Sequence, residues 1–359
     1  MTDAAAPEPE VRIEKRGRAG FIVLNRPRAL NALTLNMVRL IAGALDEFEA
    51  DDEVERVVVT CAGGRAFCAG GDIRWLYERG REGDHAAQLT FWREEYILNH
   101  RIKRFPKPYV ALMDGIVMGG GVGVSLHGSH RVASERCVFA MPEVGIGFFP
   151  DVGATYVLPR LPHRIGIYLA VTGSRAEAGD MTALGLATSF TPSDGLAALE
   201  RALETQGGAV EAILAAHAAP APASKLIAEA AMIAAAFADL DPPAILAALA
   251  TAAGQGSEFA KLAVAALALK SPTSQAIALR QMRDGAGLDF DDAMRTEFRI
   301  VSRICRGHDF YEGVRAVIVD KDNRPIWSPS AGESVAGEAV DAYFAPLGAD
   351  ELDFAKAAP

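Results

Sequence analysis

Apolar residues along this chain fall into two repeating patterns that predict its secondary structure. Short continuous runs of β-branched and other apolar residues are typical of strands, and runs without polar positions suit strands buried on both faces. Such runs occur at 20–24, 55–60 and 108–115, and 11–16 is predicted as a further short strand across a glycine turn from 20–24. Elsewhere apolar residues recur every three or four positions, which predicts amphipathic helices over 35–50, with Thr34 as an N-terminal cap, and over 85–104.

The order of these elements divides the chain into two parts. Strands, glycine-rich loops and helices alternate as far as residue 205, whereas alanine dominates the later sequence and its patterns are helical. We therefore predict an α/β fold with a mobile N-terminal tail over 1–10, an α/β core over 11–205 and a helical C-terminal region over 206–359. The alanine-rich helices either pack within the chain or form the interface of a homo-oligomer.

Composition narrows the class of protein. Half of the residues are hydrophobic and 23% are charged, which is typical of a globular chain. The net charge of −10 and the lack of a Lys/Arg cluster disfavour binding to nucleic acid or an anionic membrane. No apolar run is long enough to span a bilayer, and the N-terminus lacks the pattern of a signal peptide. Widely spaced cysteines predict reduced thiols in a cytoplasmic protein, and the histidine spacing predicts no metal site.

Two glycine-rich loops are the first candidates for chemistry. AGGD (69–72) and MGGGVG (118–123) each follow a strand-like run and open a helix. Glycine lets backbone N–H groups approach a ligand closely, and two facing loops would supply a pair of donors for the oxygen of a polarised carbonyl. The glycines could equally serve only tight turns and close helix packing, and the pattern leaves both interpretations open.

Carboxylates supply the second set of candidates. Glu143 and Asp151 flank a stretch of Val, Ile, Gly and Phe, and burial in a shared dry site would raise at least one pKa. A surface turn with two solvated acids is the competing interpretation and the favoured one on spacing alone. For the Glu94–Glu95 pair, a charged helix face is the simpler explanation. Cys68, within the first glycine-rich loop, is interpreted as a small buried residue rather than a nucleophile.

Longer motifs connect these candidates to a known family. AFCAGGDI (66–73), MGGGVGVSLHG (118–128) and MPEVGIGFFPDVGATYVLPRL (141–161) resemble the crotonase, or enoyl-CoA hydratase/isomerase, superfamily. The chain also resembles the acyl-CoA hydrolase branch of that superfamily along nearly its whole length beyond the tail. The further segments that carry this resemblance are FWREEYILNH (91–100), KSPTS (270–274) and RGHDFYEGVRAVIVDKDNRPIW (306–327).

The resemblance implies a spiral of ββα units closed by C-terminal helices, with an acyl-CoA substrate bent between the two loops. The N–H groups of Gly71 and Gly120 would form an oxyanion hole for the thioester carbonyl. Glu143 matches the catalytic glutamate of the family, and Asp151 matches the second catalytic acid of the hydrolase branch. Glu95 and Gly120 match substrate-binding positions, and Glu143 and Asp151 would contact the substrate as well.

The resemblance also implies where coenzyme A would lie. RPRALNAL (26–33) is similar to the segment that borders the CoA adenine, and its arginine would add positive charge near the phosphates. The positions implied for CoA binding are Arg28, Ala29, Leu30, Ala69, Asp72 and Ile73. No separate cofactor is expected, because CoA is part of the substrate.

One departure from the hydratase pattern decides the expected chemistry. The resemblance implies that hydratases hold the added water between two glutamates, and here Gly123 stands at the first position while Glu143 remains at the second. Asp151 stands where hydratases usually have glycine. We therefore expect hydrolysis of a short 3-hydroxyacyl-CoA, 3-hydroxyisobutyryl-CoA or a close analogue, in valine breakdown. Glu143 would act as nucleophile or general base, and the sequence does not distinguish the two.

Two alternatives stay open at this stage. An enoyl-CoA hydratase or isomerase would use the same scaffold, and an isomerase needs only one base, for which Glu143 would suffice. A catalytically inactive protein that binds acyl-CoA or a partner is the second alternative. The presence of both acids and both glycine-rich loops speaks against it.

Overall fold

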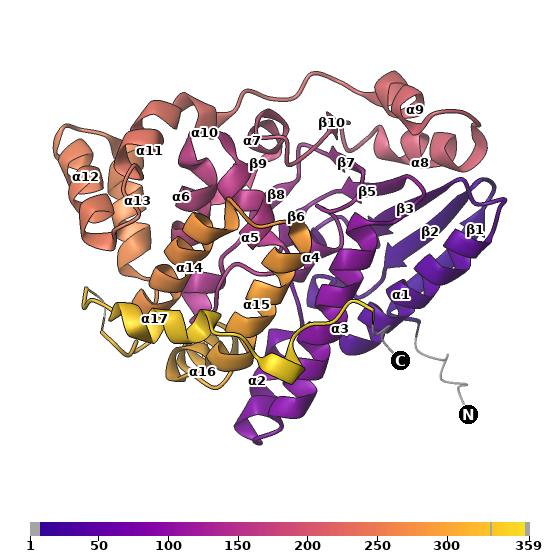
Figure 1. Cartoon of the computed structure of the whole chain (residues 1–359). Helices are drawn as coiled ribbons and strands as arrows, with labels where there is room; N and C mark the ends of the chain where they lie inside the picture. The colour runs from indigo at the N-terminus through magenta and orange to yellow at the C-terminus, as the bar shows by residue number, and fades with distance from the viewer. Residues whose placement is uncertain (1–7, 331, 356–359) are drawn as a thin grey trace, which may run out of the picture.

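The computed structural model describes residues 8–330 and 332–355 of the chain. Two β-sheets lie at the centre, and helices surround them, with the C-terminal helices beside those of the core (Figure 1). Most of the predicted tail over 1–10 lies outside the described residues. Its last residue, Glu10, does not hang free, because its carboxylate accepts hydrogen bonds from Thr34 Oγ1 and Asn36 Nδ2, both at 2.9 Å.

The larger sheet has six strands in the order β1-β2-β3-β5-β7-β10. β1 and β2 pair antiparallel, and every other pair in this sheet is parallel. The strands are β1 (Val11–Arg16), β2 (Ala19–Leu24), β3 (Arg56–Cys61), β5 (Tyr109–Met113), β7 (His130–Ala133) and β10 (Ser189–Phe190). The predicted strands are present with nearly the predicted bounds. β2, β3 and β5 are largely apolar and buried, whereas β1, VRIEKR, is a partly exposed strand at the edge of the sheet.

The smaller sheet has four strands in the order β4-β6-β8-β9. They are β4 (Ala66–Cys68), β6 (Ile116–Met118), β8 (Val138–Ala140) and β9 (Arg175–Glu177). Strands alternate between the sheets along the chain, so that β3 and β4, β5 and β6, and β7 and β8 each contribute one strand to either sheet. This alternation confirms the predicted spiral of ββα units. Because β4 and β6 are parallel neighbours, the glycine-rich loops that follow them leave the sheet at the same edge.

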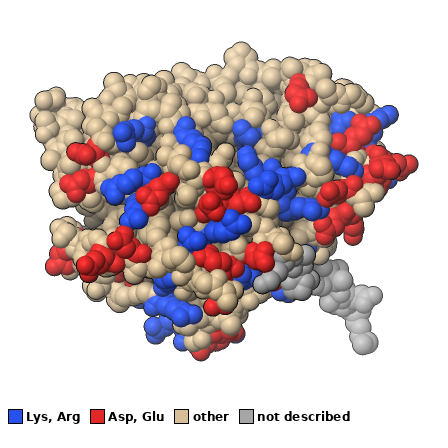
Figure 2. Space-filling model, in the orientation of Figure 1, with Lys and Arg blue, Asp and Glu red and all other residues tan. Residues whose placement is uncertain are grey.

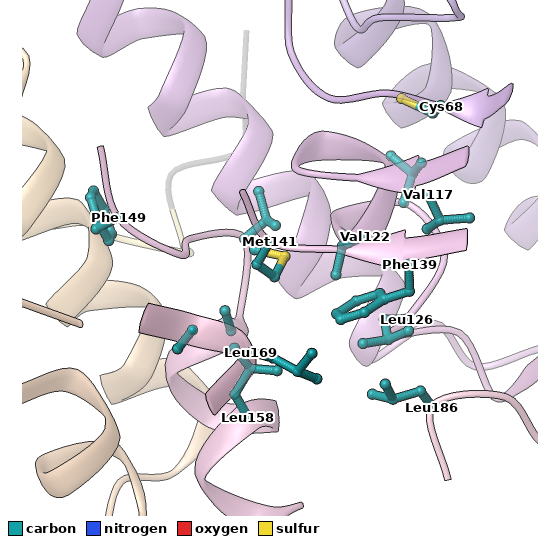
Figure 3. Packing of buried hydrophobic residues seen from close by; sticks show 14 of the residues in the cluster. Cys68, Val117, Val122, Leu126, Phe139, Met141, Phe149, Leu158, Leu169 and Leu186 are labelled. Atoms are coloured by element: carbon teal, nitrogen blue, oxygen red, sulfur yellow. The ribbon is translucent and has the colours of Figure 1, made fainter. Parts of the chain in front are cut away.

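The helices of the core cover these sheets. α1 (Leu35–Ala50) is capped by Thr34, which accepts from Met37 N at 3.1 Å, and α3 (His85–Lys103) confirms the second predicted helix. The remaining helices as far as residue 205 are α2 (Ile73–Arg81), α4 (Gly120–Gly123), α5 (Ala154–Val157), α6 (Ile165–Thr172), α7 (Ala178–Ala183) and α8 (Leu196–Thr205). Buried side chains of α4, β6 and β8, among them Val117, Val122 and Phe139, pack in the interior (Figure 3).

The helical C-terminal region is continuous with this core. Its helices are α9 (Val210–His217), α10 (Lys225–Ala228), α11 (Ala230–Ala236), α12 (Pro242–Gly254), α13 (Glu258–Ala268), α14 (Pro272–Gly285), α15 (Phe290–Ile304), α16 (His308–Val314) and α17 (Gly337–Phe344). α9 packs with α8 over one face of the larger sheet, so the predicted boundary after residue 205 falls between two helices of one layer. Side chains of α14, α15 and α16 belong to the same apolar cluster as α1 and α3.

The surface carries charges of both signs. Positive and negative side chains are interspersed on the face shown in Figure 2. Within the described residues no single helix has both the length and the hydropathy to cross a membrane. The bent pair Glu258–Ala268 and Pro272–Gly285, with 116° between its helices, passes that test only when the two are taken together.

α16 packs backbone to backbone against the short helix η2 (Glu143–Ile146). A Cβ on Gly313 would clash with the backbone of Ile146, and a Cβ on Gly147, whose φ is +68°, would clash with the carbonyl of Asp309. Glycine is therefore required on both sides of this contact. The contact places the RGHDFYEGVRA segment directly against the helix on which Glu143 lies.

This contact predicts the effect of one methyl group. Gly313→Ala should lower the free energy of unfolding by about 1–3 kcal/mol, because backbone atoms of Ile146 must move to accommodate the new Cβ. Gly254→Ala, at the end of α12 with open space around its Cβ, is the matched control and should be neutral or slightly stabilising. Denaturant unfolding of the two variants tests the packing, and equal stabilities would contradict it.

Candidate active site

The two glycine-rich loops touch each other at the edge of the smaller sheet. Gly70 and Gly119 have φ values of +123° and +47°, which favour glycine. A Cβ on Gly119 would lie 3.1 Å from the Gly70 Cα atom. The closeness of the two backbones means that the loops form one feature of the molecule, as the facing-loop interpretation of the sequence requires.

One N–H group from each loop is open. Leu33 N donates to Gly70 O and Asp72 N donates to Leu33 O, both at 2.8 Å, and this parallel bridge turns the N–H of Gly71 to the opposite side. Gly120 is the first residue of α4, so its N–H has no acceptor within the helix. Among the residues that the structure describes, neither N–H donates a hydrogen bond. Such donors can stabilise negative charge on a carbonyl oxygen.

Three carboxyl groups are buried close to these loops. Glu143, at the start of η2, and Asp151, after the FFP segment, are 6% and 5% exposed, so the surface-turn interpretation is wrong. Glu95 on α3 is 2% exposed, and its Oε1 atom lies 2.6 Å from the position that a Cβ on Gly120 would take. The charged-face interpretation of Glu94 and Glu95 is therefore wrong as well. Glu94 is also buried, and it forms a bidentate ion pair with Arg39.

Burial and mutual repulsion disfavour the ionised forms of these acids. Loss of solvent, followed by repulsion from Asp151, raises the pKa of Glu143 and of Glu95 well above the ordinary value. Burial also raises the pKa of Asp151, to about 7, although the Tyr96 hydroxyl donates to Asp151 Oδ2 at 2.8 Å and stabilises its ionised form. Glu143 Oε2 and Glu95 Oε1 have no hydrogen-bond partner among the described residues. Asp151 can therefore hold and exchange a proton near neutral pH, and Glu143 and Glu95 keep their protons to higher pH than ordinary glutamates do.

Residues from distant parts of the chain hold the Asp151 loop. Glu297 on α15 accepts from Gly153 N at 2.8 Å and from Thr155 N at 2.9 Å. Gln281 on α14 donates to Pro150 O at 2.9 Å. Sequence reasoning missed Glu297, Gln281 and Tyr96. Tyr96 adjoins Glu95 in the REEY motif, but no local signal marks the other two, which lie more than 120 residues from the loop that they support.

Gly123 packs directly against a side chain of α3. A Cβ at this position would lie 2.6 Å from Asn99 Nδ2 and 2.9 Å from Asn99 Oδ1. The Asn99 amide thus occupies the space beside Gly123, and a side chain at position 123 would require it to move.

The residues predicted to contact CoA come from two loops that are bonded to each other. Ala69 N donates to Leu30 O at 3.0 Å, and Arg26 pairs with Asp72, which caps α2. Arg28 and Ala29 are exposed in the short helix η1 (Pro27–Ala29), and Ile73 begins α2. The buried Asn31, which the sequence reasoning missed, donates to Ala66 O at 2.9 Å and ties the same loop to β4.

Other sequence candidates lie outside this chemistry. Cys68 is fully buried, and burial raises the pKa of its thiol to about 12, as expected for a small packed residue. Within the described part of the chain no three His, Cys, Asp or Glu side chains gather as metal ligands would. A cavity of about 800 Å³ lies between α12, α13, α14 and α17, and none of the predicted site residues line it.

Comparison with known proteins places this geometry in a family. Residues 19–344 match the family model described as enoyl-CoA hydratase/isomerase. The chain belongs to this family, which confirms the crotonase resemblance.

Individual relatives agree over the full length. The chain is 43% identical to the 3-hydroxyisobutyryl-CoA hydrolase, mitochondrial, of Xenopus tropicalis, over 98% of this chain and 93% of that protein. The solved carnitinyl-CoA dehydratase of Mycobacterium thermoresistibile is 40% identical with a TM-score of 0.92, covering 97% of this chain and all of the other. An enoyl-CoA hydratase of Rhodobacter sphaeroides is 42% identical with a TM-score of 0.89, covering 96% and 100%.

The names of the relatives correct one prediction. The expectation of a cytoplasmic protein is wrong, because the close relatives are named as mitochondrial enzymes. Reduced cysteines, on which that expectation rested, do not distinguish the two compartments.

The buried acids predict how stability depends on pH. The pKa of Asp151 rises from 3.8 to about 7 on folding, so its protonated form stabilises the folded state at acid pH, and this contribution is lost as the pH rises through 7. Asp151→Asn removes that loss. The free energy of unfolding of Asp151→Asn should therefore increase relative to that of the wild type as the pH rises from about 4 to 8. The increase should reach a few kcal/mol, at ~1.4 kcal/mol per pKa unit.

Urea unfolding at several pH values measures this difference. Asp52→Asn, at an exposed position in a turn, is the surface control. If the stabilities of Asp151→Asn and wild type run parallel across the range, Asp151 does not titrate as its burial requires.

Proposed function

We propose that this chain is an acyl-CoA thioester hydrolase that converts 3-hydroxyisobutyryl-CoA and water to 3-hydroxyisobutyrate and free CoA, a step of valine catabolism. The curated relatives named for this activity support the substrate. The observation that carries the reaction type is the burial of Glu143 beside the glycine-rich loops, with Asp151 near enough to raise its pKa, while no glutamate stands at position 123.

The open N–H groups of Gly71 and Gly120 bind the thioester oxygen. As a nucleophile adds to the carbonyl carbon, negative charge develops on that oxygen, and both donors are already oriented to receive it. A donor of this kind contributes a factor of about 10²–10³ to the rate. The fold supports this role because both N–H groups belong to the backbone and no side chain has to move.

Glu143 acts either as the nucleophile or as the general base. In one route its carboxylate adds to the carbonyl carbon, the C–S bond breaks, and water then hydrolyses the resulting anhydride. In the other route Glu143 accepts a proton from water as the oxygen of that water adds to the carbon. Both routes need ionised Glu143, whose raised pKa makes activity fall toward acid pH. CoA leaves as a thiolate, which needs little help from an acid because thiols have a pKa of ~8.5.

Asp151, which follows the FFP segment in the sequence, is the second acid of the proposed mechanism. With a pKa near neutrality and a fixed contact to Tyr96, it can orient the water or hold the proton released during hydrolysis. Glu95, next to Gly120, is placed for contact with the acyl group. The CoA part would follow the loops that contain Arg28, Leu30, Ala69 and Ile73.

The names of the solved relatives make hydration the second candidate. Addition of water across a double bond requires a base that activates the water and an acid that protonates the neighbouring carbon. Glu143 supplies one of them, and the wall formed by Gly123 and Asn99 carries no carboxyl group. A hydrolase is therefore the better fit to this chain.

Substrate assays separate the two reactions. The wild type should release free thiol from 3-hydroxyisobutyryl-CoA, followed with a thiol reagent, and should hydrate crotonyl-CoA far more slowly. Hydration of crotonyl-CoA without thiol release would identify a hydratase instead. CoA binding without turnover of either thioester would indicate an inactive acyl-CoA-binding protein.

Single substitutions test the two acids. Glu143→Gln and Asp151→Asn should each reduce kcat by roughly 10²–10⁴-fold while the protein stays folded, since both lose the group that moves a proton or adds to the carbonyl. Glu94→Gln is the matched control, because Glu94 is a buried acid on the helix of Glu95 but is paired with Arg39. Near wild-type turnover in Glu143→Gln would remove this residue from the mechanism.

A further inference from the structure

Asn99 is a buried amide whose polar atoms have no partners. Its side chain is fully buried on α3, and both Oδ1 and Nδ2 lack a hydrogen bond among the described residues. An amide can accept through its oxygen and donate twice through its nitrogen, and each unpaired buried group costs about 1–3 kcal/mol. Among the described residues, the buried amides Asn31 and Gln88 are paired and Gln281 is paired through its nitrogen, whereas Asn99 has no partner at either amide atom. The unpaired state of Asn99 therefore points to a ligand.

Asn99 lies close to the place expected for the acyl group. Asn99 lies four residues after Glu95, so the two side chains share one face of α3, with roughly 5–6 Å between their Cβ atoms. Both contact α4: Glu95 lies beside Gly120, and Asn99 lies beside Gly123. Glu95 Oε1 is unpaired too. Two unpaired polar groups thus border the short helix whose first N–H is open.

A neutral amide suits this position electrostatically. Three carboxyl groups already disfavour one another's ionisation here, and a fourth acid would deepen that repulsion. An amide adds no charge, yet it can donate and accept at the same time. An aliphatic hydroxyl has the complementary ability, because it also donates one hydrogen bond and accepts others.

We propose that Asn99, together with Glu95, binds the 3-hydroxyl group of the acyl substrate and so determines specificity for 3-hydroxyacyl thioesters. The inference rests on the proposed function for the identity of that substrate. In this arrangement the carbonyl oxygen binds at the N–H groups of Gly71 and Gly120, and the acyl chain runs along α4 past Glu95 and Asn99, which lie beside Gly120 and Gly123. The Asn99 amide donates to the hydroxyl oxygen, and either its own oxygen or Glu95 accepts the hydroxyl proton. A deoxy substrate leaves these groups unpaired, which is how a site of this kind rejects it.

The test is a binding comparison that needs no turnover. Calorimetric titration of Glu143→Gln protein with 3-hydroxyisobutyryl-CoA and with isobutyryl-CoA measures discrimination by the hydroxyl alone. Adding Asn99→Leu should weaken binding of the hydroxylated thioester about 10- to 100-fold and leave binding of isobutyryl-CoA unchanged or tighter. Equal weakening of both, or no change in either, would overturn the inference.

Thermal unfolding separates recognition from a structural role. Leucine is close to asparagine in size, and Asn99→Leu removes two unpaired buried groups, so its Tm should be equal to or above that of the parent. Gln88→Leu is the matched control: the same helix loses a paired amide, so Tm should fall while hydroxyl discrimination is kept. A lower Tm in Asn99→Leu with both thioesters weakened would mean that Asn99 only supports the fold.

The thiol-release assay and the binding comparison together distinguish the two proposals. If the wild type releases no thiol but Asn99→Leu loses discrimination, the hydrolase assignment fails and hydroxyl recognition stands. If thiol is released and discrimination does not depend on Asn99, the reverse holds.

Discussion

Three carboxyl groups confined to one dry site are the constraint around which this molecule is organised. Each is at least nine-tenths buried, and repulsion from Asp151 adds to the cost of ionising Glu143 and Glu95. Such an arrangement persists only if the surrounding structure holds the groups in place, because their separation or exposure to water would lower the free energy. The raised pKa values also suit these groups to proton transfer, and that of Asp151, about 7, lies near neutrality.

Contacts from several distant segments of the chain hold these buried acids in place. The Asp151 loop is held by Tyr96 on α3, by Gln281 on α14 and by Glu297 on α15. The η2 helix, which carries Glu143, is backed by α16 through glycine-to-backbone contacts. The C-terminal helices therefore support the segments on which Glu143 and Asp151 lie. This explains why the segments that resemble the hydrolase branch extend as far as residue 327.

The fold around the two glycine-rich loops is shared with solved relatives that bear hydratase and dehydratase names. Such loops suit any reaction that develops charge on a thioester oxygen. In this chain Gly123 and Asn99 contribute no carboxyl group, and Glu95, Glu143 and Asp151 supply the buried acids.

From the sequence alone, local patterns predicted the main strands and helices of the core, whereas Glu143 and Asp151 were singled out by resemblance to a family, since their spacing alone favoured a surface turn. Continuous apolar runs predicted the strands, Thr34 marked the start of α1, and the motifs around Glu143 and Asp151 pointed to a shared site. Only the tertiary structure decided that Glu95 faces inward, that Glu297 and Gln281 support a loop more than 120 residues away, and that Asn99 fills the space beside Gly123. Local patterns report hydropathy and capping along a few turns of chain. Burial and partnership of a polar side chain depend on segments that meet only after folding, and no local pattern records them.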